Sequence, residues 1–256
     1  MIINTKYKEL FVFCSTVEDG DMSGTCDSHG GEHFSAFREK TGLAKMPFYF
    51  FHILHSDKIT KYPLTRAYHR EENTKSWPFL SDDWFIDTDA LITHQKGTYF
   101  AIGFGDCNPV VIYDHVKQRL AFGHCGWRST VMNLHLKMAD ALTEAYGSRP
   151  EDMAVIFGPA IRPQSYGFAS EPDQLNEPAW KDHIIFADGL YHIDLAGYMA
   201  DGLEQKGIAA EKITMPFADT YEDPGFFSHY RAVKTGEPDG RFIFGAGIRS
   251  HEDILL

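Results

Sequence analysis

The chain has 256 residues, of which 43% are hydrophobic, 14% aromatic and 23% charged. This composition can bury a sizeable core and excludes an intrinsically disordered protein. The 36 Asp and Glu residues outnumber the 24 Lys and Arg residues, which gives a net charge of −12 with His neutral. A chain of this charge lacks the basic surface that nucleic-acid binding requires, so we expect no nucleic-acid partner.

The sequence contains no candidate signal peptide or membrane span. Charged residues interrupt segment 1–16, and no apolar run approaches the roughly 18 residues that a membrane helix needs. We therefore expect a cytoplasmic protein with no membrane partner. The four cysteines are too few for a disulfide framework and are expected to be free thiols or metal ligands. They are Cys14, Cys26, Cys107 and Cys125.

Apolar and aromatic runs predict the first strands of the chain. These runs cover residues 48–54, 90–93, 99–104, 109–113 and 119–122. From residue 130 the apolar spacing changes to the helical period, which predicts a helix over 130–146 that ends before Gly147.

The second half of the chain continues this mixture of strands and helices. Strands are expected at 154–157, 212–215 and 242–245, a helix face at Leu195, Met199 and Leu203, and a loop over 221–240. The chain has no glycine-rich nucleotide-binding motif. Because strands and helices mix without the regular alternation of a barrel, we expect an α/β (α+β) fold with a single domain over 1–256.

Two residues at strand ends are candidates for chemistry. Cys107 and His124 are 17 positions apart (124 − 107), which fits one strand out, a turn and one strand back. This spacing would bring the two side chains together at one edge of a sheet. With His55, which follows the first strand, they would form a zinc site that leaves one position open for water. Asp106 could support these ligands or transfer a proton.

Other interpretations of the same residues remain open. Most of the 13 His residues must be ordinary surface or hydrogen-bonded groups, and Cys is a common buried residue. Cys107 could instead be a nucleophile with His124 as its base, as in cysteine hydrolases. The two chemical hypotheses differ in whether the protein binds a metal.

Several residues could bind a substrate beside such a site. Arg128 could bind an anion such as phosphate in a bidentate manner, although a structural ion pair explains it equally well. Trp127 could stack on a flat substrate or simply pack. His229 and Arg231 belong to an aromatic cluster that is either a packing unit or a pocket wall. Asp89 is a further candidate for proton transfer, together with Asp106 and His229.

Several segments of the chain together resemble one protein family. They keep the family's order and spacing over most of the chain from about residue 48 onward. The chain is similar to the YfiH family, also called the multicopper polyphenol oxidase or laccase-domain family. The segments that carry the resemblance are Ile53–Ser56, Asp89–Thr93, Gly105–Val110, His124–Arg128, Gly158–Ile161 with Tyr166, and Phe227–Arg231 with Gly240 and Arg241.

The resemblance implies a fold, a metal and an activity. The fold is one domain of packed mixed sheets flanked by helices, similar to the catalytic domain of cytotoxic necrotizing factors. The metal is zinc, and the family's His, Cys and His ligands correspond to His55, Cys107 and His124. The activity is purine nucleoside phosphorolysis on adenosine, inosine and methylthioadenosine, together with adenosine deamination. The catalytic residues would be Cys107, His124, Asp106 and Arg128, and the substrate-binding residues Trp127, His229 and Arg231.

The family also leaves alternatives for this chain. They are a copper-dependent polyphenol oxidase, a cysteine-nucleophile hydrolase or amidase of peptidoglycan editing, and a metal-stabilised binding protein without activity. Three ligands are too few for a trinuclear copper cluster with a type 1 site, which favours zinc. The expected partners are a purine nucleoside and phosphate, bound by a monomer or weak homodimer.

The sequence departs from the family pattern at several positions. Val17 replaces an arginine near the N-terminus, Ile53 replaces a glutamine before His55, and Ser129 replaces a glycine after Arg128. Gly167 and Thr220 replace a common glutamate and cysteine. We therefore expect the substrate preference to differ from that of other members.

Overall fold

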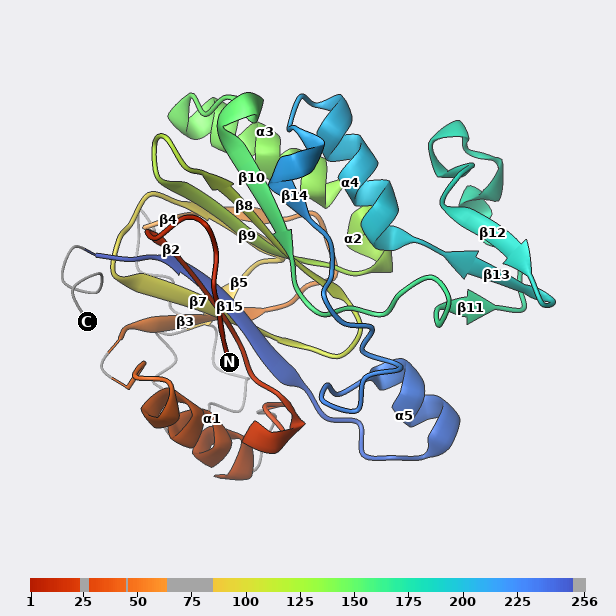
Figure 1. The fold of residues 1–256 in the computed structure, drawn as a ribbon, viewed down its shortest axis with the longest axis horizontal. Coiled ribbons are helices and arrows are strands. Elements are labelled where there is room, and N and C mark those ends of the chain that lie inside the picture. Colours follow the sequence, from red (N-terminus) through yellow and green to blue (C-terminus); the bar gives the residue numbers. More distant parts are fainter. Residues whose placement is uncertain (24–27, 45, 64–84, 251–256) are drawn as a thin grey trace.

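The computed structural model describes residues 1–23, 28–44, 46–63 and 85–250. Two six-stranded sheets pack face to face, helices cover their outer faces, and a three-stranded sheet extends to one side (Figure 1). This arrangement confirms the expected α/β class with mixed sheets flanked by helices. Within the described ranges, no helix is long and apolar enough to cross a membrane.

The first large sheet has the strand order β1-β2-β15-β7-β3-β5. The pairs from β1 to β7 are antiparallel, whereas β3 joins β7 and β5 in parallel. Its strands are β1 (Ile2–Ile3), β2 (Leu10–Cys14), β15 (Phe242–Ile248), β7 (Thr98–Phe104), β3 (Phe48–His52) and β5 (Phe85–Asp87).

The second large sheet has the order β14-β10-β8-β9-β6-β4, with the antiparallel β8–β9 hairpin at its centre. Its strands are β14 (Ile213–Thr214), β10 (Met153–Phe157), β8 (Asn108–Asp114), β9 (Arg119–Cys125), β6 (Ala90–Thr93) and β4 (Ile59–Tyr62). The small antiparallel sheet consists of β11 (Gly167–Phe168), β13 (Leu190–Ile193) and β12 (Ile184–Ala187).

The α-helices lie outside the two large sheets. They are α1 (Ser28–Lys40), α2 (Trp127–Val131), α3 (Leu134–Tyr146), α4 (Leu195–Gln205) and α5 (His229–Thr235). Short 3₁₀ helices connect other elements: η1 (Val17–Asp19), η3 (Pro150–Asp152), η4 (Asp173–Asn176), η5 (Pro178–Trp180) and η6 (Ala210–Lys212). Helix α1 covers the first sheet, whereas α3 and α4 cover the second (Figure 1).

The core is divided into layers by the two sheets. Along β8, Val110 and Ile112 face the helices α3 and α4, whereas Val111 and Tyr113 face the other sheet. Both faces of the strand are therefore buried, which explains why the predicted strands are continuous apolar runs without polar alternation. The residues at the ends of β8 are therefore held by a strand that is buried on both faces.

Two elements differ from the sequence-based expectations. The helix expected over 130–146 is two helices, α2 and α3, because Asn133 has the left-handed conformation with φ 59° between them. Asparagine tolerates this conformation better than most residues, and a helical pattern does not reveal it. The expected loop over 221–240 contains α5, which is held by contacts with distant segments rather than by its own periodicity.

Candidate functional site

The β8–β9 hairpin brings Cys107 and His124 together. Cys107 immediately precedes β8, and His124 lies near the end of β9, where it pairs with Pro109. A Cβ atom on Gly126 would lie 2.9 Å from Cys107 Sγ and 3.4 Å from His124 Cε1. Both side chains therefore border the same small space, as the 17-residue spacing predicts.

His55 reaches this space because the buried Asp89 holds its loop. The Asp89 carboxylate accepts hydrogen bonds from the backbone N–H groups of His55, at 2.8 Å, and Ser56, at 2.9 Å. It also accepts one from the Ser56 hydroxyl at 2.6 Å. These bonds hold His55 in the left-handed conformation with φ 56°, and its ring centroid lies 5.5 Å from that of His124. Asp89 is therefore a positioning residue for His55.

The charges of these groups shift one another's pKa values. Burial opposes protonation of His124, but the adjacent Cys107 sulfur and the Asp89 carboxylate outweigh it and raise the pKa of His124 to about 9. Its Nδ1 lies 3.9 Å from Asp89 Oδ1, which is an ion-pair distance beyond hydrogen-bond range. Burial lowers the pKa of His55, and His124 lowers it further. Of the two imidazoles, His124 is therefore protonated in preference to His55.

The residues at this point match zinc in donor type. One thiol and two imidazoles are ligands that zinc accepts together. The Nδ1 atom of His124 is buried and has no hydrogen-bond partner in the described part of the chain, so this imidazole has unused bonding capacity. Among the described residues no group of three His, Cys, Asp or Glu side chains stands at metal-ligand spacing. An ion held by His55, Cys107 and His124 would therefore have to draw the three side chains closer together.

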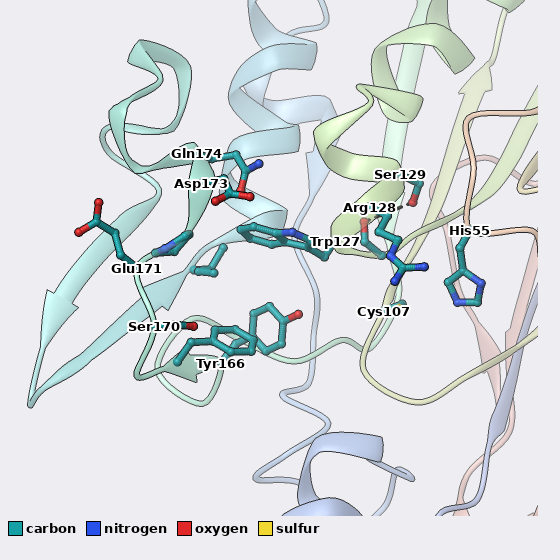
Figure 2. A pocket seen from close by; sticks show the side chains of 14 residues that line it. His55, Cys107, Trp127, Arg128, Ser129, Tyr166, Ser170, Glu171, Asp173 and Gln174 are labelled. Atoms are coloured by element: carbon teal, nitrogen blue, oxygen red, sulfur yellow. Dashed lines mark hydrogen bonds between the residues drawn. The ribbon is translucent and has the colours of Figure 1, made fainter.

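A pocket of about 570 Å³ opens beside these residues. At one end it is lined by His55, Cys107 and Arg128, and at the other by Glu171, Asp173 and Gln174 (Figure 2). Its size falls within the range of small-molecule sites. His124 is buried behind Cys107 and Gly126, with 6% of its surface exposed.

The middle of the pocket is aromatic. Trp127, at the start of α2, faces Tyr166 across the cavity in Figure 2, and Phe168 also lines the wall. Tyr166 and Phe168 are packed edge to face with ring centroids 4.7 Å apart. Burial raises the pKa of Tyr166, which further favours the protonated hydroxyl. A flat, partly polar ligand matches this part of the pocket.

Arg128 is an exposed cation at the end of the pocket lined by His55 and Cys107. It lies close enough to His55 for its charge to lower the pKa of that residue. No hydrogen bond or ion pair engages its guanidinium within the described ranges, so the structural ion pair considered from the sequence is not formed there. The group is therefore available to bind an anion.

Asp106 precedes Cys107 in the chain, but its carboxylate is hydrogen-bonded to distant segments. Its carboxylate accepts hydrogen bonds from the Thr220 hydroxyl and from the backbone N–H of Tyr230, both at 2.7 Å. These bonds tie the segment before β8 to the loop and helix that follow β14. Its position indicates that it anchors the wall of the site and does not project into the pocket.

His229 and Arg231 lie on α5, away from the lining of the pocket. The Nδ1 atom of His229 is hydrogen-bonded to Oδ2 of Asp239 at 2.8 Å. Arg231 donates to the carbonyl oxygens of Thr220 at 2.6 Å, of Tyr221 at 3.0 Å and of Phe226 at 2.8 Å. Its guanidinium thus holds a loop in place and is not free for a substrate.

The segment from Tyr166 to Gln174 forms the far wall of the pocket, and sequence reasoning assigned it no role beyond the motif residue Tyr166. Tyr166 and Phe168 alternate with Gly167, which is a period-2 signal for a strand edge. The polar residues that follow, Ser170 to Gln174, resemble any surface loop. Only the folding of β11 against β13 places them opposite α2.

Comparisons with known proteins identify relatives of the chain. The family described as multi-copper polyphenol oxidoreductase laccase matches residues 19–247. The "Purine nucleoside phosphorylase YlmD" of Bacillus subtilis is 32% identical over 158 residues, which are 58% of this chain and 56% of that protein. The human "Purine nucleoside phosphorylase LACC1" is 33% identical over 149 residues, or 56% of this chain and 35% of that protein. The chain spans about half the length of the curated relatives it matches, or less.

Solved structures share the fold. YlmD from Geobacillus stearothermophilus superposes with a TM-score of 0.77 at 20% identity, over 95% of this chain and 93% of that one. The hypothetical protein YfiH of Bacillus licheniformis gives a TM-score of 0.75 at 22% identity, over 95% and 94% of the two chains. These similarities support the arrangement of sheets and helices described above.

Proposed function

Because the chain belongs to the multi-copper polyphenol oxidoreductase laccase family, and because several relatives are named purine nucleoside phosphorylases, we propose that it is a zinc-dependent enzyme of that activity. Its substrates would be adenosine, inosine and methylthioadenosine, and it would also deaminate adenosine. The observation that carries the proposal is the pocket itself, in which an aromatic cleft separates Arg128, unpaired among the described residues, from a polar far end.

The aromatic middle of the pocket supports a purine as ligand. A base between Trp127 and the Tyr166–Phe168 pair would bury both of its faces, and base stacking on aromatic side chains contributes about 1–3 kcal/mol per base. The volume of about 570 Å³ also accommodates a nucleoside with phosphate.

The exposed guanidinium of Arg128, which lines the pocket, supports phosphate as co-substrate. Arginine binds phosphate through two parallel hydrogen bonds and thereby orients it. In phosphorolysis a phosphate oxygen bonds to C1′ of the ribose while the glycosidic C–N bond breaks. The electron pair of that bond goes to the base nitrogen, which takes up a proton, so the products are ribose 1-phosphate and the free base. Arg128 would hold the attacking phosphate beside C1′.

His55, Cys107 and His124 would hold the zinc, and Asp89 would keep the loop of His55 in place. When bound, zinc would supply the Lewis acidity that activates a water molecule for deamination. In that reaction the oxygen of water bonds to C6 of the purine, and the amino group leaves C6 as ammonia. We prefer zinc to copper because one thiol and two imidazoles are too few donors for a multicopper centre.

The test combines metal analysis with product analysis. The protein purified without chelator should contain about one zinc per chain, release adenine from adenosine only with phosphate, and form inosine without it. Cys107→Ala should lose the zinc and both activities. Cys14→Ala, which removes a buried thiol of the first sheet, should keep them. Absence of phosphate-dependent adenine release in the zinc-loaded protein would refute the proposal.

One observation favours a second candidate, a cysteine-nucleophile hydrolase. His124 lies between the sulfur of Cys107 and the carboxylate of Asp89, which is the order of groups in a nucleophile, base and orienting acid. A protein without bound metal, whose amidase activity is lost when Cys107 is alkylated, would support this candidate over the phosphorylase.

A further inference from the structure

Strand β11 and Tyr166, which precedes it, form one aromatic wall of the pocket, and this segment has one open edge. Among the described strands β11 pairs only with β13, and the carbonyl oxygen of Tyr166 accepts a hydrogen bond from the N–H of Ile193 at 3.1 Å. Because successive carbonyl groups of a strand point to opposite sides, the carbonyl oxygen of Gly167 points away from β13. Pairing within the small sheet therefore holds this wall from one side only.

Tyr230, the second residue of α5, closes the open edge. Its hydroxyl donates a hydrogen bond to the carbonyl oxygen of Gly167. Its ring centroid lies 5.8 Å from that of Tyr166 and 6.0 Å from that of Phe168. Tyr230 is not among the residues that line the pocket, so it contacts the wall from outside, where α5 lies beside β11 (Figure 1).

Two further contacts hold Tyr230 itself in place. Its backbone N–H donates to Oδ2 of Asp106 at 2.7 Å, and Asp106 immediately precedes Cys107 in the chain. The ammonium group of Lys234 lies 4.2 Å from the centroid of the Tyr230 ring, which is a cation–π contact. Through Tyr230, the aromatic wall is therefore connected to the segment that carries Cys107.

We propose that Tyr230 is a positioning residue for purine binding, which holds Tyr166 and Phe168 at the separation from Trp127 that a stacked base requires. The inference rests on the function proposed above, which places the base between Trp127 and this pair. A flat ring contacts both walls only when their separation matches its thickness, so a wall that moves outward loses these contacts. Because the side chain of Tyr230 lies outside the pocket, its loss should raise KM and leave kcat nearly unchanged.

The kinetic test compares KM and kcat for phosphorolysis of adenosine in two variants. Tyr230→Phe keeps the ring but loses the hydroxyl bond to Gly167, and the loss of one such bond changes an equilibrium by about three- to tenfold. We expect Tyr230→Phe to raise KM about threefold, and Tyr230→Leu, which also removes the ring, to raise it at least about tenfold. In both variants kcat should fall by less than about threefold. Alkylation of Cys107 should keep its wild-type rate, because the backbone bond to Asp106 is retained.

Hydrogen–deuterium exchange tests the position of the wall independently of activity. The peptide that spans residues 165–169 should exchange faster in Tyr230→Phe than in the wild type, because its open edge has lost a bond. Tyr198→Phe is the matched control, since it also removes one tyrosine hydroxyl bond, to Asn133 at 2.9 Å, outside the lining of the pocket. This control should leave both the exchange of the peptide and KM for adenosine unchanged.

The outcomes distinguish this inference from the proposed function. Absence of phosphorolysis by the wild-type protein would refute the function and with it the purine as ligand, and the exchange experiment would still decide whether Tyr230 holds the wall. Unchanged KM in Tyr230→Phe and Tyr230→Leu, in a protein that phosphorolyses adenosine, would overturn the inference and retain the function. A large loss of kcat with KM unchanged would also overturn it, because Tyr230 would then act on the chemical step.

Discussion

Substituting alanine for Gly126 should disturb the site without disturbing the backbone. Gly126 has φ −83° and ψ −177°, which alanine adopts freely, so the only cost arises from the added methyl group. That group would lie 2.9 Å from Cys107 Sγ and 3.4 Å from His124 Cε1. Since nonbonded heavy atoms prefer separations of about 3.5–4.0 Å, the sulfur must retreat by roughly 0.6 Å or more.

The expected loss follows from this displacement. A misplacement of about 1 Å in a catalytic site can reduce activity on the order of 100-fold, so Gly126→Ala should lower kcat/KM for adenosine by roughly ten- to 100-fold. Crowding of this kind destabilises a core by about 1–3 kcal/mol, which urea unfolding would measure. The alkylation rate of Cys107, followed on its peptide by mass spectrometry, should change as well and does not depend on the assigned activity.

Gly123→Ala, within β9 and three residues before Gly126, is the matched control. Its methyl group would lie 2.8 Å from Met138 Sδ and 2.9 Å from Ala90 Cβ, which is equal crowding in the core away from the pocket. We expect similar destabilisation with unchanged kcat/KM and alkylation of the folded protein. The reasoning fails if Gly126→Ala retains wild-type activity and Cys107 reactivity, or if the two variants lose activity equally.

Four further variants test the positions assigned to individual residues. Asp89→Asn should destabilise the protein by about 1–3 kcal/mol at neutral pH, because an amide cannot accept all the bonds of the 55–56 loop, and should weaken zinc binding measured by chelator competition. Although burial opposes ionisation of Asp89, His124 and Ser56 outweigh it and lower its pKa. The stability difference between wild type and Asp89→Asn, followed by urea unfolding, should therefore hold above about pH 4 and shrink as the pH falls below it. Asp106→Asn should expose the 220–230 segment to proteolysis, because the carboxylate accepts hydrogen bonds from Thr220 and Tyr230 outside the pocket. We expect kcat to fall by less than about threefold. A large loss of kcat in a variant that resists proteolysis as well as the wild type would show a catalytic role instead. Arg231→Lys should lower the unfolding free energy by about 1–3 kcal/mol without raising KM for phosphate, because its guanidinium bonds backbone carbonyls outside the pocket. Arg128→Lys should raise KM for phosphate and leave the unfolding free energy unchanged, because its guanidinium lines the pocket.

The local chemistry of the sequence predicts much of the central hairpin. Residues 109–113 and 119–122 are apolar on both faces, and the structure confirms both strands within β8 and β9. The strands extend further, to Asn108 and Cys125, because the register continues through polar and small residues that an apolar pattern does not include. The extension matters, since it determines where His124 lies.

The rest of the site depends on contacts between distant segments. The position of His55 depends on Asp89, which is 34 residues further along the chain. The start of α5 depends on Asp106, which is 124 residues from Tyr230. No local periodicity encodes such bonds. The same holds for Gln174, whose place opposite α2 results from the pairing of β11 with β13.

The two walls of the pocket belong to parts of the fold that differ in how deeply their residues are buried. One wall, with Cys107, Trp127 and Arg128, belongs to the central hairpin and α2, where nearly every neighbouring residue is buried between layers. The opposite wall belongs to the small sheet and η4, which extend beyond the two large sheets (Figure 1). In this wall Tyr166 and Phe168 pack against the core, but residues 170–174 belong to none of the core clusters, so substitutions there disturb few core contacts. Ligand choice can therefore change through residues 170–174 while the reactive groups on the hairpin stay as they are.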